Sequence, residues 1–232
     1  MKGTLYLIPS PLGDTPVENV IPGETLKALR SLKSFVVEEL RSARRYLSAA
    51  GFRGEIDTLE LHLLNEHSKE PDIEQIVSLI LKGESMGVIS EAGLPAVADP
   101  GAQLVSLAHK SGINVVPLTG PSSLMLALMA SGKNGQSFAF AGYLPVRGEE
   151  RRTRIRELER ISLKTGQSQI IIETPYRNDS LVADFLQTCS DGTTLAIACD
   201  LTTGNGFVKT KSIAQWKREI PKLNKRPCVF IL

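Results

Sequence analysis

One loop, residues 90–101, constrains the possible fold and function of this chain more than any other stretch. It follows a short apolar run, Met86–Ile89, that predicts a buried strand, and it precedes 103–110, where apolar residues recur at helical spacing. The loop is longer than a packing turn requires and holds two glycines, two prolines and two acids. Open α/β sheets bind ligands beyond the carboxyl ends of their strands. We therefore predict a ligand-binding loop, with an ordinary strand-to-helix connection as the alternative.

Strand and helix patterns alternate through the first half of the chain. Strands are predicted at 3–8, 34–37, 56–59, 86–89 and 113–116, and helices at 24–32, 43–50, 71–81, 103–110 and 124–130. Such alternation predicts a mostly parallel α/β sheet. The polar, glycine-bearing stretch 131–135 is a candidate domain boundary. Beyond it, strands at 138–141, 169–172, 194–199, 207–210 and 228–232 and helices at 149–160, 178–186 and 213–219 predict an α+β domain with mixed strand directions.

Composition narrows the class of protein. The 232 residues are 42% hydrophobic, enough for one large or two modest domains, and the net charge of +2 creates no overall field for a polyanion. The three cysteines show no Cys-x-x-Cys spacing and the three histidines no ligand spacing, so we expect no disulfide, no metal site and a cytoplasmic location. No apolar run approaches the length that spans a membrane, and the first residues are too short an apolar run for a signal peptide.

Three loops each follow a predicted strand: 9–14, 90–101 and 119–123. In a parallel sheet they would gather at one edge and could build one ligand pocket. The simpler alternative is that Ser122 and Ser123 cap the helix after Pro121 and that Asp99 caps the helix after Pro100.

Two charged segments have competing interpretations. Residues 38–41 end a strand where the three loops converge, or they begin a helix with acids placed favourably at its positive end. Arg151, Arg152 and Arg154 come without an intervening acid on the predicted helix 149–160. They predict either a phosphate-contacting face or a solvated, ion-paired helix.

Five segments together carry a resemblance to a known family. They are 5–13, 38–41, 90–101, 116–121 and 142–145, in that order along the chain. The set resembles the tetrapyrrole (corrin and porphyrin) methylases. Within that family the chain is most similar to the branch that methylates small-subunit ribosomal RNA on a cytidine 2′-hydroxyl.

The resemblance implies a two-domain α/β fold that binds S-adenosylmethionine. The expected domains are 1–117, with a mostly parallel sheet, and 118–232, with a mixed sheet; the cofactor lies in the cleft between them, and the protein is a homodimer that needs no metal. Positions matching the family's cofactor contacts are Pro11 in the first loop, Gly93, Leu94 and Val97 in the central loop, Ser122 and Ser123 after the fifth strand, and Cys199 and Cys228 in the second domain.

Some motifs depart from the RNA branch. That branch usually has Glu-Asp-Thr-Arg at 38–41, Ser-Asp-Ala-Gly-Thr-Pro at 90–95 and Arg-Glu-Leu-Thr at 199–202, where this chain differs. We expect a methyltransferase acting on ribosomal RNA, with Glu39 as a base and Arg41 orienting substrate. Methylation of a small tetrapyrrole, or RNA binding without catalysis, are the alternatives.

Overall fold

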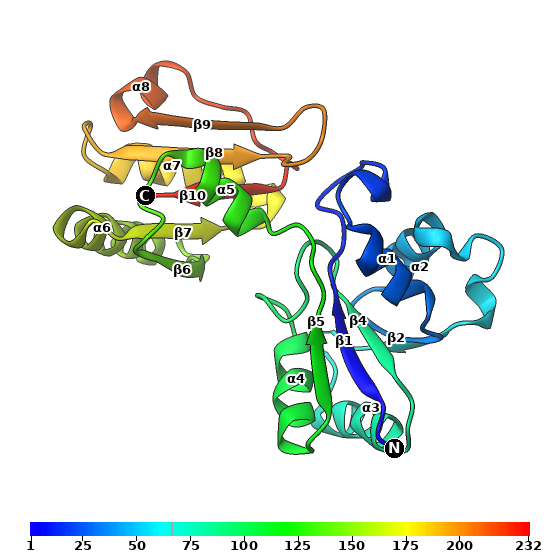
Figure 1. The fold of residues 1–232 in the computed structure, drawn as a ribbon. Coiled ribbons are helices and arrows are strands. Elements are labelled where there is room, and N and C mark those ends of the chain that lie inside the picture. The colour runs from blue at the N-terminus through cyan, green and yellow to red at the C-terminus, as the bar shows by residue number, and fades with distance from the viewer. Residues whose placement is uncertain (66) are drawn as a thin grey trace. The chain divides into compact units, whose positions relative to one another are not determined.

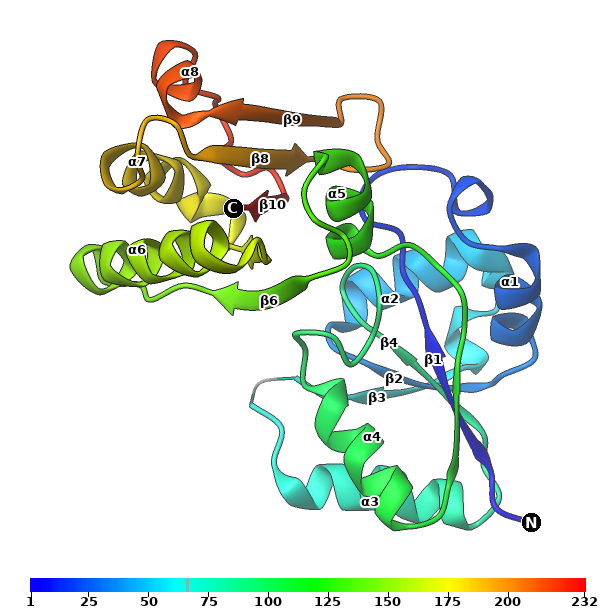
Figure 2. The same cartoon turned by 60° about the vertical axis from the view of Figure 1, so that its left-hand side comes forward.

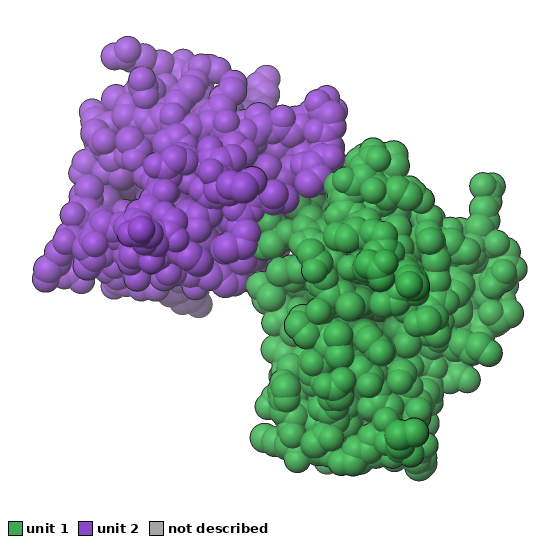
Figure 3. Space-filling view, in the orientation of Figure 1, with its two compact units in different colours: residues 1–122 green, residues 123–232 purple. Residues whose placement is uncertain are grey.

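The computed structural model describes residues 1–65 and 67–232, which form two compact units, 1–122 and 123–232 (Figure 3). The division falls shortly after the predicted boundary at residue 117, and the polar stretch 131–135 lies inside the second unit. In the described part of the chain, every helix is too short or too polar to cross a bilayer.

Unit 1 is built on a parallel sheet of five strands in the order β3-β2-β4-β1-β5 (Figure 1). The strands are β1 (Thr4–Ile8), β2 (Ser34–Val37), β3 (Glu60–Leu63), β4 (Met86–Ile89) and β5 (Asn114–Pro117). β2 and β4 are buried along their whole length, as expected of apolar strands that are covered on both faces. The predicted parallel sheet is confirmed.

The α-helices described in unit 1 cover both faces of this sheet (Figure 2). They are α1 (Gly23–Arg30), α2 (Leu40–Leu47), α3 (Glu70–Leu81) and α4 (Gly101–Lys110). Side chains alternate between the faces along each strand. Phe35 and Val37 therefore pack in the core with α1 and α2, whereas Val36 packs in the core with α3 and α4.

Unit 2 is built on a mixed sheet of five strands in the order β6-β7-β10-β8-β9. The strands are β6 (Phe138–Tyr143), β7 (Ser168–Ile172), β8 (Thr194–Cys199), β9 (Phe207–Ser212) and β10 (Cys228–Ile231). β6 and β7 are parallel, and the remaining neighbours are antiparallel. The prediction of mixed strand directions is confirmed.

Helices α5 (Ser123–Ser131), α6 (Gly148–Thr165), α7 (Asn178–Thr188) and α8 (Ile213–Arg218) complete unit 2. The larger core lies under α6, α7 and α8 and contains Trp216, Phe185 and Phe230. The Trp216 indole donates to the carbonyl of Leu195 over 2.9 Å, so its polar group is satisfied inside the core. On the other face, α5 packs on a smaller apolar cluster of the sheet.

Candidate active site

The parallel strands of unit 1 deliver their loops to one edge of the sheet, where backbone hydrogen bonds join the first and central loops. Ser10 donates from its amide to the carbonyl of Gly93 over 2.8 Å, and Gly93 donates back to the carbonyl of Ser10 over 3.1 Å. The Ser10 hydroxyl also donates to the carbonyl of Ser90 over 2.8 Å. The predicted convergence of these two loops is therefore confirmed, and hydrogen bonds join their backbones directly.

The loop after β5 packs on the first loop through a glycine. A Cβ atom at Gly120 would lie 2.3 Å from the Cβ of Pro9, so this approach requires glycine. Two helix hydroxyls fix the same loops: Thr25 donates to the carbonyl of Thr119 over 2.7 Å, and Tyr46 donates to the carbonyl of Pro9 over 2.8 Å. Sequence reasoning missed both hydroxyls because one polar atom on an amphipathic helix leaves no pattern.

The central loop holds an unfavourable backbone conformation. Ala96 and Ala98 have φ values of 64° and 62°, in the left-handed region that non-glycine residues avoid. The Asp99 carboxylate accepts hydrogen bonds from the amides of Ala96 and Gly101 over 2.9 and 2.8 Å. Burial raises the pKa of Asp99, while these hydrogen bonds act in the opposite direction. Asp99 thus fixes both the loop and the start of α4.

The predicted cofactor contacts of the central loop differ in exposure. Gly93 is buried with a φ of 74°, and a Cβ there would lie 3.2 Å from Cδ2 of Leu12. The group that approaches Gly93 closely is therefore a side chain of the first loop. Leu94 is half-buried, whereas Val97 is exposed and available to a ligand.

A cavity of about 460 Å³ opens beside the joined loops. Its walls are residues 10–15, the face of α2 that carries Tyr46, and residues 89–92. The volume falls within the range of small-molecule sites, about 300–1,000 Å³. Pro11 is the predicted cofactor residue that lines this cavity.

Glu39 caps α2. Its carboxylate accepts hydrogen bonds from the amides of Arg41 and Ser42 over 2.8 and 2.7 Å. These bonds lower the pKa of Glu39, which makes the carboxylate a weaker base than a free glutamate. The helix-start interpretation of residues 38–41 is therefore correct, and the geometry argues against Glu39 as the base. The Arg41 residue is exposed.

Two further acids lie where β2 and β4 end. The Ser42 hydroxyl donates to the Glu91 carboxylate, and the Glu91 amide donates to the Glu38 carboxylate over 3.4 Å. Because β2 and β4 are neighbours, the Glu38 carboxylate meets the backbone of Glu91, although the two residues are distant in the sequence. Sequence reasoning included Glu38 in a motif but could not see its proximity to Glu91.

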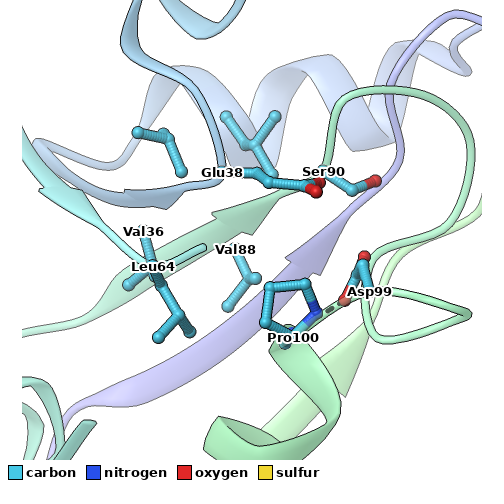
Figure 4. Close-up of a pocket in the computed structure, with 10 residues that line it drawn as sticks. Val36, Glu38, Leu64, Val88, Ser90, Asp99 and Pro100 are labelled. Carbon is cyan, nitrogen blue, oxygen red and sulfur yellow. Dashed lines mark hydrogen bonds between the residues drawn. The ribbon is translucent and has the colours of Figure 1, made fainter. Parts of the chain in front are cut away.

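Figure 4 shows a second, much smaller pocket beneath this group. Glu38 and Ser90 lie above the apolar side chains of Val36, Leu64 and Val88. Its volume of about 10 Å³ is room for roughly one water molecule. The cavity beside the first loop is therefore the better candidate for a cofactor.

The structure corrects the predicted arginine face of α6. Arg151 is 4% exposed; its guanidinium donates to the Asp184 carboxylate over 2.6 Å and to the Ser180 hydroxyl over 2.7 Å. Arg152 donates to the other oxygen of Asp184 over 3.2 Å, and Arg154 pairs with Glu157 over 3.0 Å. Arg151 therefore belongs to the contact between α6 and α7 and cannot meet a phosphate in this arrangement, while Arg152 and Arg154 remain partly exposed.

Ser122 and Ser123 are half-buried at the boundary in the sequence: Ser122 ends unit 1 and Ser123 begins α5. Cys199 and Cys228 lie opposite each other on β8 and β10, in the core under α6, α7 and α8. The hydrogen bond with Cys199 and burial raise the pKa of the Cys228 thiol. At these two positions the structure shows core packing, and cofactor contact stays a prediction.

The segment after β8 is strained. Asp200 and Thr202 have φ values of 47° and 71°, and the Asp200 carboxylate accepts a hydrogen bond from Arg226 over 2.6 Å. Backbone strain of this kind persists where the surroundings fix it, often at functional sites. This segment is also one of the motifs in which the chain departs from the RNA branch.

Comparison with curated proteins finds relatives named Ribosomal RNA small subunit methyltransferase I. The relative from Vibrio cholerae is 31% identical over 198 residues, 85% of this chain and 65% of its own length. Those from Halalkalibacterium halodurans and Pseudomonas aeruginosa are 34% and 27% identical, over 80% and 99% of this chain and 60% and 78% of their own lengths. The chain thus spans less than two thirds of the length of the first two. No family model matches it.

Solved structures share the fold at 16% identity. Diphthine synthase has a TM-score of 0.70, with 99% of this chain and 89% of that chain covered. The methyltransferase CobJ has a TM-score of 0.65, with 99% and 93% covered, and uroporphyrin-III-C-methyltransferase from Thermus thermophilus 0.57, with 100% and 92% covered. The two five-stranded sheets and these likenesses lead to one conclusion: the chain has the fold of these solved structures and is similar in sequence to the proteins named Ribosomal RNA small subunit methyltransferase I.

Proposed function

We propose that the chain transfers a methyl group from S-adenosylmethionine to the 2′-hydroxyl of a cytidine ribose in small-subunit ribosomal RNA. The observation that carries the proposal is its 31–34% identity, over 80–85% of the chain, to proteins named Ribosomal RNA small subunit methyltransferase I. A ribosomal substrate places the protein in the cytoplasm, in agreement with its unpaired, buried cysteines.

The unit 1 cavity supports cofactor binding. S-adenosylmethionine supplies an electrophilic methyl group on a positively charged sulfur. The chain's part is to hold donor and acceptor in line, and a pocket whose loops are already joined by Ser10 and Gly93 is suited to that task. The proposed cofactor contacts are Pro11, Gly93, Leu94, Val97, Ser122, Ser123, Cys199 and Cys228.

On the substrate side, Arg41 is the residue proposed to orient the RNA. Glu39 acts through the cap that positions Arg41 at the start of α2. With Glu39 engaged in the cap, the carboxylates of Glu38 and Glu91 are the proposed acceptors for the hydroxyl proton, because they lie at the ends of neighbouring strands.

The RNA surface proposed for α6 contains fewer arginines than the sequence predicted. Arg152 and Arg154 remain in it, because their side chains are 34% and 41% exposed. Arg154 and Arg147 also line a groove of about 460 Å³ on α6. Three glutamates share that groove, so the surface is mixed in charge and the proposed phosphate contacts are few.

A homodimer is also part of the proposal. Large apolar side chains are exposed on α5 and on β6, the edge strand of the second sheet. They are Met125, Met129, Phe138, Phe140 and Tyr143. Exposed apolar side chains on an edge strand and on a helix are suited to burial against a second copy of the chain.

The test is transfer of labelled methyl groups from S-adenosylmethionine to three substrates: small ribosomal subunits, free small-subunit RNA and tetrapyrrole precursors. We expect transfer to a ribosomal substrate, with the label on a cytidine 2′-O-methyl after nuclease digestion. Transfer to the tetrapyrrole alone would overturn the proposal. Binding of S-adenosylhomocysteine without transfer to any substrate would instead support an RNA-binding relative that lacks catalysis.

A further inference from the structure

Three potential metal ligands meet at the amino-end edge of the unit 1 sheet, at the opposite end of the strands from the joined loops. Glu60 begins β3, His62 follows two residues later on the same face of the strand, and Glu84 lies just before β4. One ligand atom from each residue lies within 4.8 Å of the other two. The set unites residues that are adjacent in the sheet and distant in the sequence.

Strand register and a buried serine bring the group together. Ser34 of β2 pairs with Glu60 of β3 on one side and with Met86 of β4 on the other. Ser34 is 4% exposed, and its hydroxyl donates to the Glu84 carboxylate. Ligating carboxylates in metal sites are commonly oriented by a hydrogen bond of this kind.

The backbone beside Glu84 is also fixed. A Cβ atom at Gly3 would lie 2.0 Å from the carbonyl oxygen of Glu84, so β1 approaches this turn as closely as glycine allows. The amide of Thr4 donates to the Ser85 hydroxyl over 3.0 Å. Glu84 is therefore presented by a rigid turn.

His62 provides an independent indication of a ligand. Its Nε2 atom is buried and has no hydrogen-bond partner among the described residues. A buried polar atom without a partner costs stability, and native structures satisfy such atoms with protein groups, water or an ion. An imidazole nitrogen beside two carboxylates is a donor set for a divalent cation.

We propose that Glu60, His62 and Glu84 bind one divalent transition-metal ion of the Zn²⁺ type, with solvent completing the coordination. Ligand atoms about 2.1 Å from a zinc ion lie within about 4.2 Å of one another, so small rotations of the glutamate side chains close the set. The imidazole favours Zn²⁺ over Mg²⁺ and Ca²⁺, which prefer six or more oxygen ligands. The ion tethers the edge strand β3 to the turn before β4 and relieves repulsion between the carboxylates.

The test is calorimetric titration of the metal-stripped full chain with zinc chloride. We expect one site per chain that is weakened at least tenfold in His62→Ala and in Glu84→Gln, with Mg²⁺ binding far more weakly. His109→Ala is the matched control, because His109 is an exposed histidine of unit 1 on α4 and should leave the affinity unchanged. Zinc should raise the melting temperature of wild type and of the control, and not of His62→Ala.

Equal melting temperatures of wild type and His62→Ala in chelator would show that the variant folds. Unchanged zinc affinity in folded His62→Ala would overturn the proposal, as would absence of zinc binding by wild type. The facing thiols of Cys199 and Cys228 are the competing ligands. Binding that is lost in Cys228→Ser and kept in His62→Ala would place the ion there and equally overturn it.

Discussion

At the scale of single residues, Gly120 decides how closely two loops of the proposed active site approach. A Cβ at Gly120 would lie 2.3 Å from the Cβ of Pro9, so Gly120→Ala must push the loops apart. We expect it to lower the free energy of unfolding by about 1–3 kcal/mol, the usual cost of overpacking. Urea denaturation measures the change. Gly23→Ala is the control, since nothing lies within 4 Å of the added methyl group, and an equal loss there would contradict the explanation.

Arg151 is the residue at which sequence reasoning failed most clearly. Arg151→Gln leaves the Asp184 carboxylate, which is 9% exposed, with only the longer contact to Arg152. We expect a loss of about 3 kcal/mol in the free energy of unfolding, as when one partner of a buried ion pair is removed. Arg154→Gln should change it by less than about 0.5 kcal/mol, because its ion pair is largely exposed. Similar losses in the two variants would refute the assignment of Arg151 to the core.

A signal for the burial of Arg151 was present in the sequence. Arg151 precedes Ile155 by one helical turn, and Ile155 and Leu158 form the buried face of α6. The pattern of that face therefore includes position 151. Its partner Asp184 lies on α7, and no local pattern identifies a pairing made by tertiary packing. Likewise, the strand predicted at 56–59 begins only at Glu60, so the shared face of Glu60 and His62 was missed, and Glu84 joins them only in the folded sheet.

At the scale of elements, the cap of α2 gives a prediction that depends on pH. The folded pKa of Glu39 lies below its unfolded value, so its contribution to stability is present above the unfolded pKa, about 4.3. It is lost as pH falls through the folded pKa. At pH 7, Glu39→Ala should melt about 2–4 °C below wild type.

Thermal unfolding across pH checks the cap. The difference between wild type and Glu39→Ala should shrink in acid, whereas the difference between Glu39→Gln and Glu39→Ala should stay constant, since neither side chain titrates. A difference between wild type and Glu39→Ala that is the same at pH 3 and pH 7 would contradict the cap as the source of stability.

The predicted bounds of a helix or strand match the structure where a single apolar pattern covers the whole element. β2 was predicted at its observed bounds because all four of its residues are apolar or small and buried. The helix predicted at 43–50 instead begins at Leu40, because Glu39 acts as the cap, and from Ser48 the chain continues as a wider turn that contains Gly51 at φ 126°. The joined loops were predicted at one edge, but the Ser10–Gly93 hydrogen bonds depend on a strand order that pattern alone does not give.

At the scale of the whole molecule, the proposed homodimer can be tested on α5. Met129 is 76% exposed, and Met129→Glu would place a charge in the proposed interface. We expect the variant to sediment as a monomer where wild type sediments as a dimer, by analytical ultracentrifugation. Leu163→Glu is the control, because Leu163 is 67% exposed on α6 and lies outside the proposed interface. A monomeric wild type, or dimers of equal strength in all three proteins, would contradict the proposal.

The places of β1 and β10 in their sheets set the order in which a growing chain can fold. β1 lies between β4 and β5. Leu5 therefore cannot pair until Met86 and Val115 have been synthesised. β10 lies between β7 and β8, so the second sheet cannot close until residues 228–231 have been synthesised. Each unit therefore leaves the ribosome with strand edges unpaired for most of its synthesis. Such edges expose the nascent chain to aggregation and make chaperone assistance most valuable just before each sheet closes.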